Sequence, residues 1–409
     1  MATSKNSSNG RKNSGKDGSG ATIWATDPGD LLLVGPTFDL SSLDRAATPG
    51  WTGDEDAADA FRLQRGELLS EMQERLFAQA RAGGGTRSVL LVVQGLDTAG
   101  KGGIIRHVAG LMDPQGLALR SFGAPTAEEL RHHYLWRVRR SLPTPGKVGI
   151  FDRSHYEDVL VVRVNHLADV DWDKRFDEIN RFEKQVVDGG TVIVKVALMV
   201  SREEQGLRLM ERLDRPDKNW KFNPGDVDTR SKWDDYQAAY QVMLVNTSTH
   251  YAPWHVIPAD NKWYARVAVT ELLAQALASL ELTWPTVPWQ VEDQKRRLAA
   301  TMDPATLVKA AESAATEAEE VHEETAAHAD DVREVNELAA VDANGGASPE
   351  VAWGDDVAQE DTVAATAADG RTATGEQPAS GGQPAPAAEA QSGGKGKKKD
   401  RKKGKSGKK

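Results

Sequence analysis

Apolar and polar positions along the chain form two kinds of segment, one typical of helices and the other of buried strands. The first long segment, residues 58–81, carries an apolar stripe at helical spacing, formed by Leu68, Leu69, Met72 and Leu76. Three consecutive glycines beginning at Gly83 interrupt the stripe and are expected to end the helix. An uninterrupted apolar run rich in β-branched residues follows at 89–93, and together with the next residue, Gln94, it predicts a buried strand at 89–94.

The same alternation continues toward the carboxyl terminus. Further strands are predicted at residues 117–122, 147–151, 191–200 and 255–258. Helices are predicted between and after them at 101–112, 127–140, 172–188, 202–213, 228–248 and 263–282. Because long helical segments separate successive strands, we expect the strands to run parallel rather than to form hairpins. The pattern therefore predicts an α/β fold whose parallel sheet is covered by helices on both faces.

Three segments outside this pattern have biased compositions. Residues 1–22 are rich in Ser, Gly, Asn and Lys, and residues 343–409 in Gly, Ala, Pro and Ser, so both are predicted to be disordered tails. Residues 291–342 form an acidic, Ala- and Glu-rich extension whose composition is compatible with helix. Within 301–350 there are 13 Asp and Glu against two Lys and Arg, whereas 395–409 holds ten Lys and Arg against one Asp.

Overall composition excludes several classes of protein. The formal net charge of −10 reflects the opposed end segments and says little about the folded region. The absence of cysteine excludes a disulfide framework, a thiolate metal site and a thiol nucleophile. Residues 1–22 lack the apolar core of a secretory signal, and no stretch approaches the roughly 18 apolar residues of a membrane span. We therefore expect a soluble, cytoplasmic protein without membrane contact.

A glycine-rich loop follows the strand predicted at 89–94 and has the spacing of a phosphate-binding loop. Its key residues are Gly95, Gly100, Lys101, Gly102 and Gly103. Glycines let backbone N–H groups turn toward a phosphate, and the next helix adds the positive potential of its N-terminus. The Ser or Thr that usually holds Mg²⁺ is replaced by Gly102. An ordinary strand–helix turn is the alternative interpretation.

Two carboxylates are candidates to replace the missing hydroxyl. Asp152 ends a buried strand and is expected beside the phosphate loop, whereas Asp97 lies within the loop itself. Carboxylates at such positions hold Mg²⁺, and Arg153, the next residue, can clamp phosphate oxygens. For Asp97, a helix cap or a turn residue is the alternative role.

Positive charge is concentrated after the longest predicted strand. Arg208 and Arg212 are four residues apart and share one helix face. The charge continues past the helix end at Arg215, Lys218 and Lys221. A basic helix with a proline-containing loop is typical of a lid that closes over polyanions. The alternative is a solvated helix face on which these charges pair with neighbouring glutamates.

Four separate motifs together resemble the family-2 polyphosphate kinases. They are Gly95–Gly103, Pro125–Leu130, Phe151–Asp158 and Ala252–Tyr264, in the family order, within a similarity that covers roughly residues 55–285. The resemblance implies a three-layer α/β/α sandwich with a parallel sheet, a P-loop kinase-like fold similar to thymidylate kinases. It also implies a catalytic domain at 23–290 with a helical lid at about 202–232.

The resemblance further implies an activity. The family transfers a phosphoryl group reversibly from inorganic polyphosphate to adenine or guanine nucleotides, AMP to ADP or ADP to ATP, with Mg²⁺ as cofactor. It also implies a homo-oligomer, a dimer or a tetramer. Residues 155–164 resemble members that accept nucleoside monophosphates. Two departures are that some of those relatives carry Asn in place of Asp152, and that relatives often carry basic residues in place of Gly206 and Leu207.

Matching positions in the family motifs imply roles for individual residues. Asp97 and Asp152 correspond to metal-organising carboxylates, Lys101 and Arg153 to phosphate ligands, and Arg212 to a lid arginine facing the transferred group. The candidate polyphosphate contacts are Arg106, His132, Arg208 and Lys221, and the candidate nucleotide contacts are Arg153, Tyr156 and Glu157.

Two other functions stay open. An ATP-dependent nucleoside or nucleotide kinase of the thymidylate-kinase type would share the phosphate loop and the Asp152–Arg153 pair. A nucleic-acid-associated scaffold would act through the Lys-rich end, because lysine runs attract polyanions without sequence preference. The same end could also be a solubilising tail or could gather polyphosphate for the folded domain.

Overall fold

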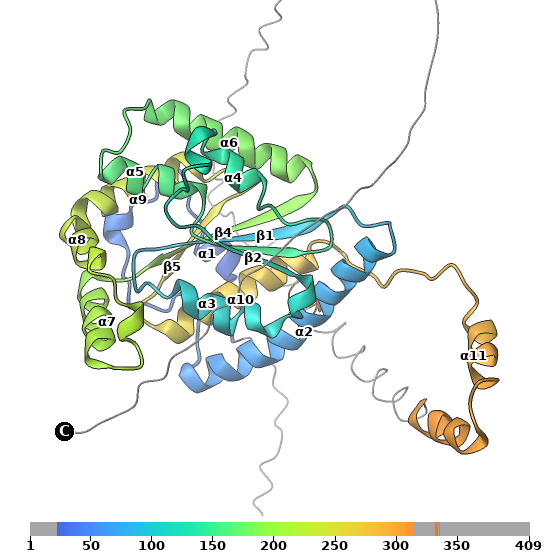
Figure 1. Cartoon of the computed structure of the whole chain (residues 1–409). Coiled ribbons are helices and arrows are strands. Elements are labelled where there is room, and N and C mark those ends of the chain that lie inside the picture. Colours follow the sequence, from blue (N-terminus) through green and yellow to red (C-terminus); the bar gives the residue numbers. More distant parts are fainter. Residues whose placement is uncertain (1–22, 315–331, 334, 336–409) are drawn as a thin grey trace, which may run out of the picture. The chain divides into compact units, whose positions relative to one another are not determined.

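A five-stranded sheet forms the centre of the described part of the chain (Figure 1). The structure is a computed structural model that describes residues 23–314, 332, 333 and 335. The strands are β1 Ser88–Gln94, β2 Leu117–Ser121, β3 Val148–Asp152, β4 Thr191–Met199 and β5 Trp254–Pro258. Their order is β2-β3-β1-β4-β5, and each neighbouring pair is parallel. The predicted parallel α/β fold is confirmed.

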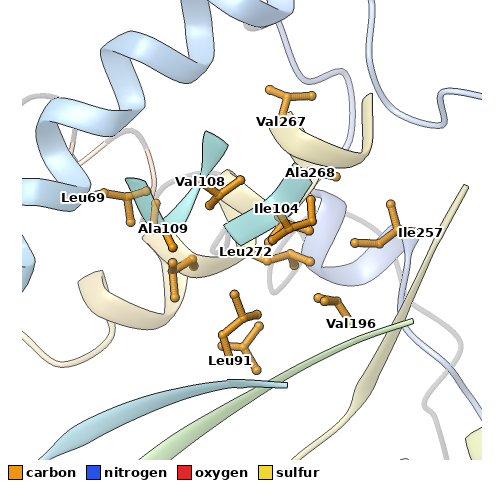
Figure 2. Packing of buried hydrophobic residues seen from close by; sticks show 14 of the residues in the cluster. Leu69, Leu91, Ile104, Val108, Ala109, Val196, Ile257, Val267, Ala268 and Leu272 are labelled. Atoms are coloured by element: carbon orange, nitrogen blue, oxygen red, sulfur yellow. The ribbon is translucent and has the colours of Figure 1, made fainter. Parts of the chain in front are cut away.

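Helices cover both faces of this sheet, which makes the predicted three layers (Figure 1). One face carries α2 Glu55–Arg81, α3 Lys101–His107 and α10 Lys262–Ala278; the other carries α4 Leu135–Arg139, α5 Val161–Val164, α6 Trp172–Asp188 and α9 Trp233–Thr247. Side chains of β1 alternate between the two cores, with Leu91 in the first and Leu90 and Val92 in the second. In Figure 2, Leu91 lies below Ile104 of α3 and Leu272 of α10.

The remaining described elements are further helices and several 3-10 turns. The helices are α1 Pro28–Leu31, α7 Arg202–Asp214, α8 Gly225–Ser231 and α11 Val291–Ala299. The 3-10 turns are η1 Leu40–Ser42, η2 Ala109–Leu111, η3 Pro114–Gly116, η4 Glu129–Arg131, η5 His155–Asp158 and η6 Asn219–Lys221. Among the described residues no helix is both long and apolar enough to cross a membrane.

Residues 32–34 cover the open edge of β5. The Val34 N–H donates to the Trp254 carbonyl at 2.8 Å, and the Val256 N–H donates to the Leu32 carbonyl at 2.8 Å. These bonds satisfy backbone groups that an edge strand would otherwise expose to pairing with another chain.

Three helix predictions are wrong in detail. The helix expected at 101–112 ends at His107 and continues only as η2. The helix expected at 127–140 is divided into η4 and α4, because His132 between them is extended and Glu129 turns back to accept from the Thr126 N–H. The helix expected at 228–248 is divided into α8 and α9, since Lys232 leaves helical geometry while its ammonium donates to Asn165 at 2.6 Å.

The end segments are described only in part. The tails predicted at 1–22 and 343–409 lie outside the described residues. Of the acidic extension at 291–342, the structure describes α11, a second helix at 304–314, and the three residues 332, 333 and 335.

His255 on β5 gives the fold a predictable acid sensitivity. Burial lowers the pKa of its imidazole from the ordinary 6.5 to about 4. The unfolded chain therefore takes up a proton between these values that the folded chain does not, so stability should fall as pH is lowered through that window. We expect a loss of about 3 kcal/mol from this group. Urea unfolding at pH 7 and pH 4.5 measures the difference in the free energy of unfolding. If His255→Gln loses as much stability between these two pH values as the unaltered chain, other groups cause the sensitivity.

Candidate active site

The phosphate loop lies at the carboxyl end of β1, where the loops after the parallel strands meet. Gly95 and Gly100 have positive φ values of 156° and 116°. A Cβ at Gly95 would lie 2.8 Å from the Leu198 carbonyl oxygen, so β4 allows only glycine there. A Cβ at Gly102 or Gly103 would have no atom within 4 Å, so this side of the loop opens to a pocket.

Lys101 is the first residue of α3 and folds back onto the loop. Its Nζ donates to the Gly95 carbonyl at 2.5 Å and to the Leu96 carbonyl at 3.2 Å. Burial lowers the pKa of this ammonium, the charge of Arg153 adds to the effect, and Asp97 opposes it. A bound phosphate would therefore replace weak carbonyl acceptors with charged oxygens.

Asp97 and Arg153 form an ion pair that joins two loops. An Arg153 N–H (Nη2) donates to Asp97 Oδ1 at 3.1 Å. Although burial opposes the charge, Glu157, Asp97 and Asp152 raise the pKa of Arg153. The N-cap of α3 is Gly100, with no side-chain cap, so Asp97 does not cap that helix.

Asp152 ends β3 beside Val93 of β1 and has an unused oxygen. Its Oδ1 is buried without a hydrogen-bond partner among the described residues, while its Oδ2 accepts from Ser121 Oγ at 3.5 Å. A buried carboxylate oxygen without a partner is costly unless a cation or a donor reaches it. The donor chemistry at this sheet edge therefore fits a divalent cation, although the described residues include no cluster of three or more acidic or histidine ligands.

Two pockets meet at the Asp97–Arg153 pair, and both are lined by these two residues. The first, of about 790 Å³, has mixed walls that include Leu96, Phe122, Tyr134, Leu160, Tyr236 and Tyr240. The second, of about 850 Å³, is basic, with walls that include Lys101, Arg106, Arg212, Lys218, Lys221, Lys262 and Arg266. A flat, partly apolar ligand suits the first pocket and a polyanion the second.

Most of the residues predicted from the sequence lie in these pockets. The basic pocket contains Asp97, Gly100, Lys101, Gly102, Gly103, Arg106, Asp152, Arg153, Arg208, Arg212 and Lys221. His132, expected with them, instead lines the mixed pocket with Gly95 and Glu157, and its ring stacks on Trp136 at 4.1 Å. Tyr156 is fully buried and lines neither pocket; its hydroxyl donates to Glu183 at 2.7 Å.

Glu157 lines the mixed pocket. Burial raises the pKa of its carboxyl group, and the charges of Arg153 and Lys101 oppose that rise. The side-chain amide of Gln94 satisfies its neighbours when its oxygen and nitrogen are exchanged. In that orientation the amide nitrogen donates to Glu157 Oε1 at 3.1 Å. The carboxyl group is thus held close to the positive charges of the phosphate loop.

The basic residues of the predicted lid divide into two groups. Arg215 pairs with Asp217 at 2.8 Å and with Glu211 at 3.2 Å, as expected for a solvated face. Arg212 pairs with Asp226 of α8 at 3.2 Å and still lines the basic pocket. The solvated-face interpretation therefore holds for Arg215, whereas Arg212 lies at the basic pocket, and a lid that closes over polyanions stays a prediction.

Sequence reasoning missed part of the basic pocket. Lys262 and Arg266 lie on the first turns of α10, which follows the end of β5. Their spacing of four residues puts them on one helix face, a signal that the sequence already contains. Tyr240 of the mixed pocket carried no such signal, because an aromatic residue on an amphipathic helix usually belongs to the core.

Residues 54–283, which include the residues that line both pockets, match the model of the family described as Polyphosphate kinase 2. This chain belongs to the polyphosphate kinase 2 family. A relative from Meiothermus ruber, named AMP/ADP-polyphosphate phosphotransferase, is 43% identical over 249 residues, 61% of this chain and 91% of its own. An ADP-polyphosphate phosphotransferase from Rhodopseudomonas palustris is 39% identical over 264 residues, 61% of this chain and 89% of its own.

A solved structure of the family has the same fold. The crystal structure of Polyphosphate Kinase 2 from Arthrobacter aurescens TC1 is 46% identical and superimposes with a TM-score of 0.66. The match covers 68% of this chain and 98% of that one. Membership of the family thus agrees with the loop, the strand-end aspartate and the sheet order described above.

Proposed function

We propose that this chain transfers a phosphoryl group from inorganic polyphosphate to a nucleotide, AMP to ADP, ADP to ATP or both. The observation that carries the proposal is the meeting of a basic pocket and a mixed pocket at Asp97 and Arg153. Polyphosphate is a flexible polyanion without apolar surface and suits the basic pocket. A nucleotide has a flat base and a charged phosphate end, and suits the mixed pocket. The names of the relatives, AMP/ADP- and ADP-polyphosphate phosphotransferase, support the same substrates.

The reaction requires positioning and charge neutralisation. An oxygen of the nucleotide's terminal phosphate bonds to the last phosphorus of polyphosphate, and the bond from that phosphorus to the bridging oxygen breaks. The shortened polyphosphate leaves with the bridging oxygen and its electron pair. The attacking phosphate is already ionised, so no strong general base is needed. Lys101, Arg153 and Arg212 all line the basic pocket, which supports a role for them in binding the phosphate oxygens of donor and acceptor.

We propose Mg²⁺ as the cofactor, held by Asp97 and Asp152. Mg²⁺ commonly binds one or two protein carboxylates together with substrate phosphates. Bound there, it would neutralise charge on the phosphoryl group in transfer. The unpartnered Oδ1 of Asp152 supports this assignment. Homo-oligomerisation, a cytoplasmic location and polyanion contact through residues 395–409 stay predictions from the sequence.

An assay without ATP tests the proposed function. The full chain is incubated with polyphosphate, Mg²⁺ and one of AMP, ADP, GMP or GDP, and the products are separated by ion-exchange chromatography. We expect a nucleotide with one additional phosphate from at least one acceptor, and none from Lys101→Met. Product formed only when ATP replaces polyphosphate would refute the proposal in favour of an ATP-dependent nucleotide kinase.

A further inference from the structure

Two side chains of α7 hold the backbone of the phosphate loop. Arg208 is 5% exposed and Gln205 is fully buried, although both lie on a helix with charged residues on most of its surface. Their partners are backbone carbonyls of the phosphate loop and of the end of β5, together with the side chains of Glu204 on the same helix and Arg230 on a neighbouring helix. Such contacts within the protein are not expected of residues whose main role is to bind a mobile polyanion.

The Arg208 guanidinium uses four hydrogen bonds to join three parts of the fold. Nη1 donates to the Thr98 carbonyl at 2.9 Å. Nη2 donates to the carbonyls of Ala259 and Asp260, at 2.8 and 2.7 Å, and Nε donates to Glu204 Oε1 at 2.7 Å. Since a guanidinium has five N–H groups, four of them are occupied within the protein. Arg208 therefore connects α7, the phosphate loop and the end of β5.

Gln205 extends the same connection to α8. Its amide nitrogen donates to the Asp97 carbonyl at 3.3 Å, and its amide oxygen accepts from Arg230 of α8 at 3.0 Å. The base of α7 is fixed as well, because Asp260 Oδ1 accepts from the N–H of the N-cap residue Ser201 at 2.7 Å. Through Gln205 and Arg208, α7 thus holds two successive carbonyls of the loop, those of Asp97 and Thr98.

The held segment has a backbone conformation that needs support. Thr98 has a φ of 65°, in the left-handed region that β-branched residues rarely adopt. Its Oγ1 is buried without a partner among the described residues. Such conformations persist only where surrounding contacts enforce them. The Arg208 bond to the Thr98 carbonyl is such a contact, and the side chain of the preceding residue, Asp97, reaches Arg153.

We propose that Arg208 and Gln205 are positioning residues for the phosphoryl-transfer reaction. They hold the backbone of Asp97 and Thr98 so that the Asp97 carboxylate faces Arg153 at the junction of the two pockets. Arg208 acts through its hydrogen-bond geometry rather than as a polyphosphate ligand, and the lid helix and the phosphate loop form one unit. The inference rests on the proposed function only in that Asp97 acts at the reaction centre.

Arg208→Lys distinguishes geometry from charge. Lysine keeps the positive charge but offers donors from a single nitrogen, which cannot span the carbonyls of Thr98 and Asp260 as the guanidinium does. We expect a fall in kcat on the order of 100-fold. Polyphosphate affinity, measured by calorimetry on the full chain without nucleotide, should stay unchanged. Gln205→Leu should also lower kcat, by a smaller factor. In the double variant with Arg208→Lys and Gln205→Leu, the loss of transition-state stabilisation should be smaller than the sum of the two single losses, because both residues hold the same segment.

Two control variants make the test selective. Lys221→Met removes an exposed cation of the basic pocket and is the positive control for binding: it should weaken polyphosphate affinity, and the remaining affinity should depend less on salt concentration. Arg65→Lys alters a buried ion pair with Glu271, between α2 and α10, and should lower thermal stability without changing kcat.

Several outcomes would refute the assignment. Wild-type kcat in Arg208→Lys, together with weaker polyphosphate binding in Arg208→Met, would make Arg208 a polyphosphate ligand. An equal fall of kcat in Arg65→Lys, at an equal loss of melting temperature, would make the role only structural. The comparison uses whichever donor, polyphosphate or ATP, supports turnover of the unaltered chain. Failure of the proposed function therefore does not decide this test.

Discussion

Asp97→Asn should lower kcat by roughly 100- to 1,000-fold if Asp97 holds the proposed metal, because losing charge stabilisation at such a site costs several kcal/mol. Asparagine has nearly the size of aspartate, so the loop should keep its shape while the charge disappears. Asp97 lines both pockets and its carboxylate binds Arg153 at 3.1 Å, so the substitution acts at the proposed meeting point of donor and acceptor. Initial rates over a range of polyphosphate and nucleotide concentrations measure the effect.

Whether the substitution changes kcat or KM shows at which stage of the reaction Asp97 acts. A group that acts mainly in the transition state lowers kcat, whereas a group that binds substrate equally well before and during transfer raises KM. We expect the fall to lie mostly in kcat for both substrates. Asp59→Asn, which removes a carboxylate paired with Arg62 on α2, is the control and should leave both constants unchanged. Turnover close to wild type in Asp97→Asn would remove Asp97 from the reaction centre.

Prediction of β1 succeeded because this strand is buried on both faces. Val89–Val93 are all buried, since helices cover both sides of the sheet, and the sequence shows this as an uninterrupted apolar run. The helix α6 matched its predicted bounds for a related reason, because its N-cap Asp171 and the glycines after Asp188 mark both ends. Where the helix at 228–248 was predicted without a break, the break coincides with a distant contact, that of Lys232 with Asn165, which no local pattern reveals.

The candidate site could likewise be predicted only in part from the sequence. The phosphate loop and the strand-end pair Asp152–Arg153 could be predicted because each motif is local and parallel strands bring their carboxyl ends together. Arg208 could not be placed, since its spacing from Arg212 predicts a shared face but says nothing of which backbone carbonyls lie opposite. The positions of His132 and Tyr156 likewise depend on tertiary packing.

A buried network behind the site has the largest expected effect on stability. Lys195 of β4 is fully buried, and its Nζ donates to Glu183 Oε2 at 2.6 Å, to the Tyr156 hydroxyl at 2.8 Å and to the Thr247 carbonyl at 2.7 Å. Glu183 Oε1 accepts from Tyr156 at 2.7 Å and contacts His155 Nε2 at 3.2 Å. Burial works to raise the pKa of Glu183, but the charge of Lys195 outweighs it and the pKa of this carboxyl lies below its ordinary value. Burial lowers the pKa of Lys195, and the charge of Glu183 opposes that fall.

Glu183→Ala should therefore destabilise the fold by about 3–5 kcal/mol, because an ammonium group stays buried without its counter-charge. Urea unfolding at pH 7 measures the loss. Tyr156→Phe removes only a hydroxyl and should cost about 1–2 kcal/mol. The double variant Lys195→Met with Glu183→Leu should regain most of the stability of the single variant, since it removes both charges. A loss below about 1 kcal/mol in Glu183→Ala would mean that water or another group compensates the charge.

The same network should also affect catalysis, because it includes two residues of the turn that follows Asp152 and Arg153. His155 and Tyr156 lie two and three residues after Arg153, which has a φ of 64°, so their anchoring holds the turn from which Asp152 and Arg153 reach the pockets. The double variant separates the two effects. If it restores stability but not kcat, the network positions the turn; if it restores both, the buried charges serve the fold alone.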